Sequence, residues 1–159
     1  MGRVGDWLSG KVRDPLAREL RQGATPEGLA ASVATGTAIG VLPLLGSTTV
    51  LCALAGKVLR LNHVALQLTN YLLYPAQLAL LVPFVRLGEW LFGAEPMPLD
   101  PSTVLTEFAA GPGAFLAKFA WAGVHGVTAW ALTAPACGWI LHRALRPVFR
   151  KMADLNPRT

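Results

Sequence analysis

Charged side chains are scarce in this chain of 159 residues, where aspartate, glutamate, lysine and arginine make up 14%, against about 25% in typical soluble domains. Acidic residues number nine, and none lies inside an apolar run. This absence argues against proton-coupled carboxylate chemistry within those runs. Hydrophobic residues instead reach 53% of the chain. Several apolar stretches are long enough to span a bilayer, which predicts an integral membrane protein with a single domain.

Cysteine is also scarce, and the patterns of catalytic or metal-binding residues are missing. Cys52 and Cys137 both lie within apolar segments, which indicates small core residues without a disulfide framework. The three histidines are not at metal-ligand spacing, and the hydroxyls of residues 47–49 have no base nearby in the sequence. We therefore expect no catalytic residues, no metal and no cofactor, and hence no enzymatic activity.

A proline and a glycine break a long uncharged run into two arms, residues 29–42 and 47–60. Pro43 has no N–H to continue a helix, and Gly46 tolerates the left-handed backbone of a turn. Each arm would rise only about 21 Å as a helix, whereas the hydrocarbon core of a bilayer is about 30 Å thick. Neither arm spans alone, so we predict that residues 25–62 form a re-entrant hairpin.

The hairpin carries two further features. Ser47, Thr48 and Thr49 follow the turn and can cap the free N–H groups of the second arm. Gly36 and Gly40 form a G-x-x-x-G pattern, which lets another helix backbone approach closely. We expect the turn to be packed within protein, because in lipid each freed backbone group needs a partner.

Residues 63–92 are predicted to form a transmembrane helix, since the uncharged part, 64–85, would rise about 33 Å. Pro75 and Pro83 should kink it. Helical spacing places Gln67, Asn70, Tyr74 and Gln77 on one face. This face has two interpretations. The amides could hydrogen-bond to the hairpin turn, or they could line a site for a polar or anionic headgroup where two broken helices meet.

The remaining segments complete the predicted architecture. The segment 1–24 is amphipathic and is either an interfacial helix in the headgroup plane or a solvated helix packed on the membrane domain. An external loop, 93–118, should contain a short helix after Asp100-Pro101. A second kinked transmembrane helix is expected over 119–146, followed by a basic tail, 147–159.

The bases are distributed asymmetrically. They concentrate before residue 25, after the hairpin and after the last apolar run, whereas acidic residues dominate 93–118. Lysine and arginine favour the cytoplasmic side of a membrane. The pattern therefore predicts that both termini and both flanks of the hairpin are cytoplasmic. The net charge of +5 indicates anionic lipid headgroups as partners, and not nucleic acid, because the bases lie at helix ends beside apolar segments.

A longer pattern resembles a known family. It consists of Pro26, Ala30, Gly36, Gly40-Val41-Leu42-Pro43, Gly46, Thr49, Leu61-Asn62, Asn70-Tyr71, Tyr74-Pro75 and Gln77. Over about residues 20–93 the chain is similar to the bacterial membrane domain of unknown function numbered two thousand and sixty-two. The resemblance implies a bacterial inner-membrane protein near lipid-linked sugar metabolism, in a family sometimes fused to glycosyltransferases. It brings no catalytic residues to carry over.

Two functional hypotheses follow for an all-α integral membrane protein with a broken re-entrant hairpin and two kinked transmembrane helices. In the first, the chain binds or helps translocate a lipid or lipid-linked amphiphile between the Pro43–Thr49 turn and the Asn70–Gln77 segment. In the second, it is a non-catalytic structural or assembly partner of other membrane proteins. Transport would call for a homo-oligomer or another membrane protein, since one copy has few helices with which to enclose a path.

Overall fold

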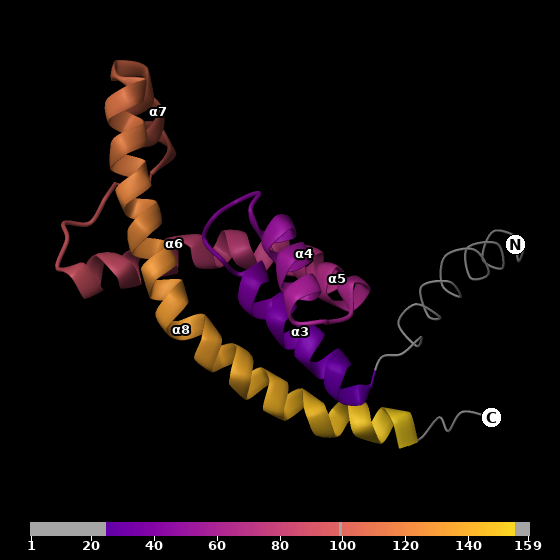
Figure 1. Ribbon diagram of the computed structural model, residues 1–159. Helices are drawn as coiled ribbons and strands as arrows, with labels where there is room; N and C mark the ends of the chain where they lie inside the picture. The colour runs from indigo at the N-terminus through magenta and orange to yellow at the C-terminus, as the bar shows by residue number, and fades with distance from the viewer. Residues whose placement is uncertain (1–24, 99, 155–159) are drawn as a thin grey trace, which may run out of the picture.

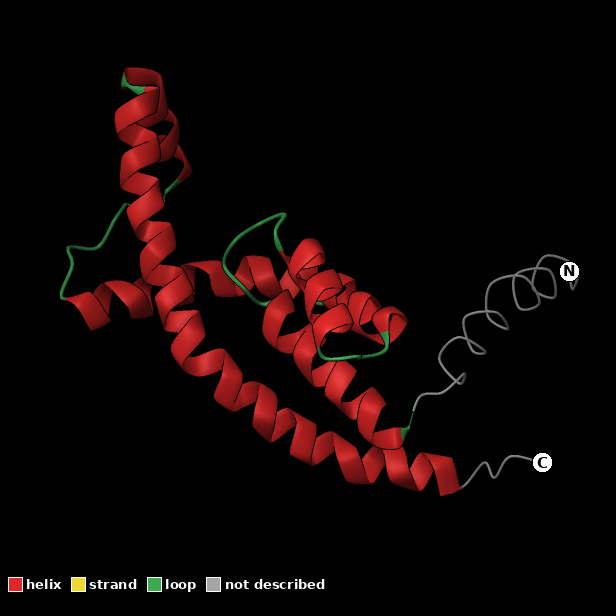
Figure 2. Cartoon of the chain, viewed as in Figure 1, coloured by secondary structure: helices red, strands yellow, loops and turns green. Residues whose placement is uncertain are grey.

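The computed structural model describes residues 25–98 and 100–154. Every regular element within these ranges is an α-helix, which confirms the predicted all-α class (Figure 2). The segment 1–24, predicted to be amphipathic, lies outside the described residues. In chain order the described helices are α3 (Pro26–Gly40), α4 (Thr48–Val58), α5 (His63–Leu72), α6 (Tyr74–Phe92), α7 (Pro101–Ala110) and α8 (Pro112–Asp154).

The long, curved helix α8 is the element against which α3, α6 and α7 pack (Figure 1). Its 43 residues rise about 65 Å. Helix α3 packs along its C-terminal part and α6 crosses its N-terminal part, while α5 packs between α3 and α4. Helix α7 folds back beside the first turns of α8. The last helix is thus longer at both ends than the expected 119–146, and it includes part of the predicted loop and tail.

Helices α5 and α6 replace the single kinked span expected over residues 63–92. They are bent by 64° relative to each other, because Pro75 has no N–H with which to continue the hydrogen-bond ladder of α5. Pro83, in contrast, lies inside α6 without ending it.

By length and composition, the bent pair α5–α6 together could cross a membrane. None of the other described helices, and neither member of the pair alone, is both long and apolar enough to do so. This includes α8, which contains the transmembrane helix predicted over 119–146.

Short polar side chains begin three of the described helices. The hydroxyl oxygen of Thr25 accepts a hydrogen bond from the N–H of Gly28 at 3.0 Å, and Asn62 Oδ1 accepts one from Ala65 at 2.8 Å. Asp100 caps α7, and hydrogen bonds from Ser102 and then Thr103 lower the pKa of its carboxyl group to about 2. Asp100 therefore keeps its negative charge at physiological pH.

Small residues let the helices approach α8 closely. A Cβ at Gly126 of α8 would lie 3.3 Å from both Pro43 and Val85, so the hairpin turn and α6 meet α8 at this point. About one turn further, the indole Nε1 of Trp130 donates a 2.7 Å hydrogen bond to the carbonyl oxygen of Ala38. Close contact between backbones, together with few large buried side chains, is how helices associate where lipid replaces water.

Candidate functional site

The hairpin turn joins α3 to α4 through buried Pro43 and through Gly46, whose φ of +84° favours glycine. Ser47 occupies the N-cap position of α4, but its side chain makes no capping hydrogen bond. Its hydroxyl instead donates to the carbonyl oxygen of Leu44 at 2.8 Å. The expectation that Ser47 caps the second arm is therefore wrong, because the turn itself contains a nearer acceptor.

Side chains from distant helices satisfy carbonyl groups freed by the break after α3. A helix leaves its last four carbonyls without partners inside the helix, and Trp130 supplies the donor for that of Ala38. In the turn itself, the amide Nε2 of Gln77 donates a 2.7 Å hydrogen bond to the carbonyl oxygen of Leu42. Gln77 is 2% exposed, so this bond is sheltered from solvent and links α6 to the hairpin turn.

The other residues of the predicted polar face are placed differently from one another. Gln67 donates from Nε2 to the carbonyl oxygen of Thr49 at 3.0 Å, which ties α5 to the start of α4. Thr48, which precedes Thr49 in the sequence, is buried. Asn70 is also buried, but Tyr74 is 53% exposed and points away. The structure thus brings three of the four residues to the hairpin side, and the bend after Leu72 turns Tyr74 outward.

Two amides retain unused hydrogen-bonding capacity. The Oε1 atom of Gln67 is the one buried side-chain oxygen or nitrogen without a hydrogen-bond partner among the described residues. Asn70 is 4% exposed, and its side chain makes no hydrogen bond to any described residue. Each amide could accept or donate a further bond. Gln67 Oε1 is enclosed by protein atoms, so the Asn70 amide is the part of the predicted face with hydrogen-bonding capacity left for a ligand.

Gly36 and Gly40 lie on the side of α3 that faces α5. A Cβ at Gly36 would approach the carbonyl oxygen of Leu66 to 2.7 Å, and one at Gly40 would lie 3.4 Å from Asn70. On the same side, the Oγ of Ser32 accepts a 2.9 Å hydrogen bond from the N–H of Asn62. The structure therefore uses this small-residue face for packing between α3 and α5.

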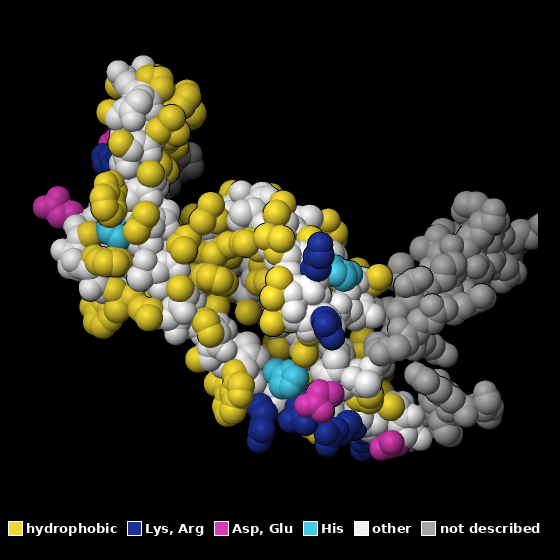
Figure 3. Space-filling model, viewed as in Figure 1, with side chains coloured by type: hydrophobic (Ala, Val, Ile, Leu, Met, Phe, Trp, Pro, Cys, Tyr) yellow, Lys and Arg dark blue, Asp and Glu magenta, His cyan; other side chains and the backbone are white. Residues whose placement is uncertain are grey.

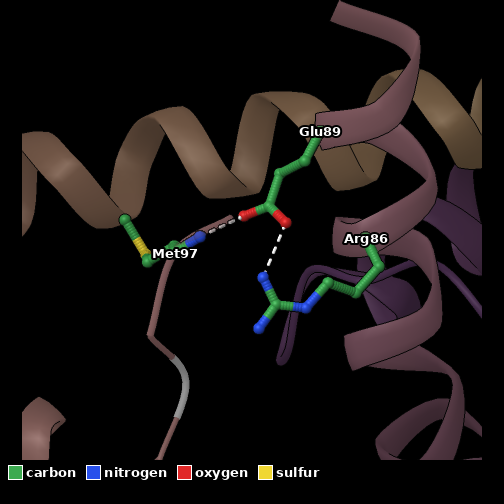
Figure 4. A network of polar contacts seen from close by, with 3 residues as sticks. All are labelled: Arg86, Glu89 and Met97. Carbon is green, nitrogen blue, oxygen red and sulfur yellow. Dashed lines mark hydrogen bonds and ion pairs between the residues drawn. The ribbon is translucent and has the colours of Figure 1, made fainter. Parts of the chain in front are cut away.

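A buried carboxylate near the end of α6 was missed by the sequence reasoning. Glu89 is 3% exposed; one of its oxygens forms a 2.8 Å ion pair with Arg86, and the other accepts a 2.8 Å hydrogen bond from the N–H of Met97 (Figure 4). The i, i+3 spacing of Arg86 and Glu89 could have indicated the ion pair. Nothing local indicates the fold-back of Met97 that buries it.

Chemically, the described residues offer hydrogen bonds and apolar contacts. They contain no group of three or more histidine, cysteine, aspartate or glutamate side chains arranged to hold a metal ion. The family model described as "Uncharacterized protein conserved in bacteria (DUF2062)" matches residues 11–156. The chain belongs to this family. No curated protein and no solved structure matches it significantly.

Membership of DUF2062 confirms the resemblance found in the hairpin and the following helices, and it extends that resemblance along most of the chain. The match includes α7 and nearly all of α8, so the family unit contains the helix against which α3 and α6 pack. The protein is accordingly bacterial. The family description names no activity.

Proposed function

We propose that this DUF2062 protein is a non-catalytic structural module embedded in the bacterial inner membrane. It contacts lipids and other membrane proteins through its outer apolar faces. The observation that carries the proposal is the distribution of side chains around a broken hairpin. Small apolar residues and a few polar ones fill the interior contacts, and many large apolar side chains face outward.

The buried polar residues hold the interior together through hydrogen bonds. Buried polar residues include Ser32, Thr48, Asn70, Gln77 and Glu89. Ser32, Gln77 and Glu89 each hydrogen-bond to the backbone of another segment, which is how a membrane-embedded break keeps its carbonyl and amide groups satisfied. A buried polar side chain in a membrane protein usually faces the bundle interior. The amide of Gln77 is thereby used for folding.

The exposed apolar side chains are most regularly arranged on α4. Val50, Leu54 and Val58 are spaced four residues apart and are 61%, 55% and 76% exposed. On a helix this spacing forms a continuous stripe. Leu72 of α5 and Leu132 of α8 add further large exposed apolar side chains. A contiguous apolar surface of this kind marks a face for lipid or for another protein.

The second candidate function is binding or translocation of a lipid or lipid-linked amphiphile. The unbonded amide of Asn70 favours it, since Asn70 lies beside Gly40 of the hairpin. A bound headgroup would satisfy this amide. In this function the amide face would bind the headgroup. Substitutions there would then change lipid binding more than stability.

Replacing Gln77 by leucine should lower the free energy of unfolding in detergent by about 1–2 kcal/mol, the value of an interhelical hydrogen bond. The variant loses the donor to Leu42 and keeps a similar volume. Under the structural proposal, the amount of lipid that co-purifies per folded protein stays unchanged. Thermal unfolding and native mass spectrometry of the same sample measure both quantities.

Tyr74→Phe is the matched control, because it removes a polar atom from the exposed side of the same helix. It should change neither quantity. Asn70→Leu tests the second candidate, and a tenfold loss of bound lipid with unfolding unchanged would favour the amphiphile site over the structural module.

A further inference from the structure

The described bases and acids separate toward opposite ends of the molecule. Figure 3 shows lysine and arginine side chains along the C-terminal part of α8 and others over the α4–α5 region. The bases at this end are Lys57, Arg60, Arg143, Arg146, Arg150 and Lys151, accompanied by the acids Glu27 and Asp154. The opposite end carries Arg86 and Lys118 against Glu89, Glu95, Asp100 and Glu107. We call the six bases of the first set the basic end.

Three contacts place both parts of the basic end beside the first half of α3. Glu27, in the first turn of α3, forms ion pairs with Arg146 at 2.6 Å and with Arg150 at 3.7 Å. The loop after α4 joins the same half of α3 through the Asn62–Ser32 hydrogen bond. Bases from α4 and α8 that are far apart in the sequence thus lie at the same end of α3.

Arg60 sits in a conformation that arginine rarely adopts. Its φ is +53°, the one positive value at a non-glycine residue among the described residues. It follows the C-cap residue of α4, where the N–H of Leu61 donates to the carbonyl oxygen of Gly56 at 2.9 Å. Glycine is the usual residue at this position of a Schellman motif. Strain retained by an exposed residue points to a role in function.

Apolar side chains flank the exposed bases. Val58 and Leu59 precede Arg60, and both are exposed. On α8 the guanidinium of Arg143 lies 5.6 Å from the ring centroid of Trp139, which is 65% exposed. Tryptophan beside arginine or lysine is typical of the headgroup level of a membrane. The same surface therefore offers charge to headgroups and apolar area to acyl chains.

We propose that the basic end binds the headgroups of anionic phospholipids, with Arg60 held in a strained conformation as one of its anchors. This inference rests on the membrane residence proposed above and adds the class of lipid that the surface selects. Six bases against two acids match a negatively charged leaflet, whose attraction acts on each lysine or arginine near the surface.

The test uses the full chain in detergent, exposed to equal amounts of phosphatidylglycerol and phosphatidylcholine with identical acyl chains. Native mass spectrometry should show more bound phosphatidylglycerol than phosphatidylcholine. Arg60→Gly should reduce that ratio about fivefold, the effect of one base near a charged surface. Without lipid, the same variant should raise Tm by about 2–4 °C, because glycine relieves the strain.

Arg60→Lys keeps the charge and the strain, so its lipid ratio and its Tm should both stay near those of the original protein. Lys118→Gln removes one exposed base from the opposite end and should leave the ratio unchanged. An unchanged ratio in Arg60→Gly, or an equal fall in Lys118→Gln, overturns the proposal. Loss of co-purified nucleic acid in Arg60→Gly, with the lipid ratio kept, would assign the surface to nucleic acid and also overturn it.

A separate measurement tests whether the protein resides in the membrane. If alkaline carbonate releases the protein from membranes, the embedded module is refuted. Headgroup selection is then decided by sedimentation of the detergent-free protein with vesicles of phosphatidylglycerol or of phosphatidylcholine. Equal binding to both vesicles would overturn the headgroup proposal as well.

Discussion

Replacing Gly88 by alanine is expected to destabilise the protein by about 3 kcal/mol or more, the upper end of the overpacking range. Gly88 lies on α6 where that helix crosses α8, and an added Cβ would collide with the backbone of His125. Backbone atoms of a packed helix have no alternative rotamer, so the two helices would have to separate. Equilibrium unfolding in detergent measures the loss.

Gly123→Ala provides the control for this substitution. Gly123 lies on α8 near the same crossing, but a Cβ there would meet no atom within 4 Å. Alanine in an open helical position is more favourable than glycine by about 0.5–1 kcal/mol. The two glycine-to-alanine changes should therefore shift stability in opposite directions. A loss of similar size at both positions would mean that the crossing of α6 and α8 is wrongly placed.

Replacing Glu89 by alanine should cost about 2–4 kcal/mol. The variant removes a buried acceptor from the N–H of Met97, which costs about 1–3 kcal/mol, and it also breaks the ion pair with Arg86. The Arg86 side chain is 42% exposed, so water compensates part of the loss of its ion pair. Thermal and denaturant unfolding of the full chain test this value.

Glu107→Ala is the matched carboxylate deletion. Glu107 pairs with Lys118 at 2.6 Å, but both side chains are substantially exposed. Surface pairs contribute about 0–1 kcal/mol, so this variant should unfold close to the original protein. Glu89→Gln keeps one acceptor oxygen for Met97 and should fall between the two. A cost for Glu107→Ala equal to that for Glu89→Ala would contradict the burial of Glu89.

Local chemistry in the sequence was sufficient to indicate the start of α7. Asp100 caps that helix by accepting a hydrogen bond from the N–H of Thr103, three positions further along the chain. The family resemblance rested on the hairpin and the following helices, and its membership is confirmed. A helix cap depends on short-range hydrogen bonding, which the order of residues determines.

Proline was harder to interpret between residues 93 and 118. The short helix predicted after Asp100-Pro101 is confirmed, since α7 begins at Pro101. The density of proline and glycine predicted loop for the rest, but α8 begins at Pro112. At the first position of a helix a missing N–H costs nothing, so the same residue that breaks one helix can begin the next. Which role it takes depends on what the following residues pack against, and here that is the neighbouring helix.

The contacts that complete the candidate site join distant parts of the chain. Trp130 bonds to Ala38, and Glu27 pairs with Arg146. No spacing rule connects residues so far apart in the sequence. The burial of Gln77 could be expected from its helical face, and Pro75 predicts a bend between α5 and α6. The size of that bend, 64°, depends on tertiary packing, and with it the choice of the carbonyl of Leu42 as the acceptor.

The orientation of the basic end tests the central claim most directly. With Cys52 and Cys137 replaced by alanine, single cysteines are introduced as Arg60→Cys, Arg150→Cys and Asp100→Cys, and each variant is labelled with an impermeant maleimide in spheroplasts. We predict that positions 60 and 150 react only after the inner membrane is opened, and that position 100 reacts while it is intact. Positions 60 and 150 labelled from opposite sides, or all three labelled from the same side, would contradict a membrane-embedded module with a cytoplasmic basic end.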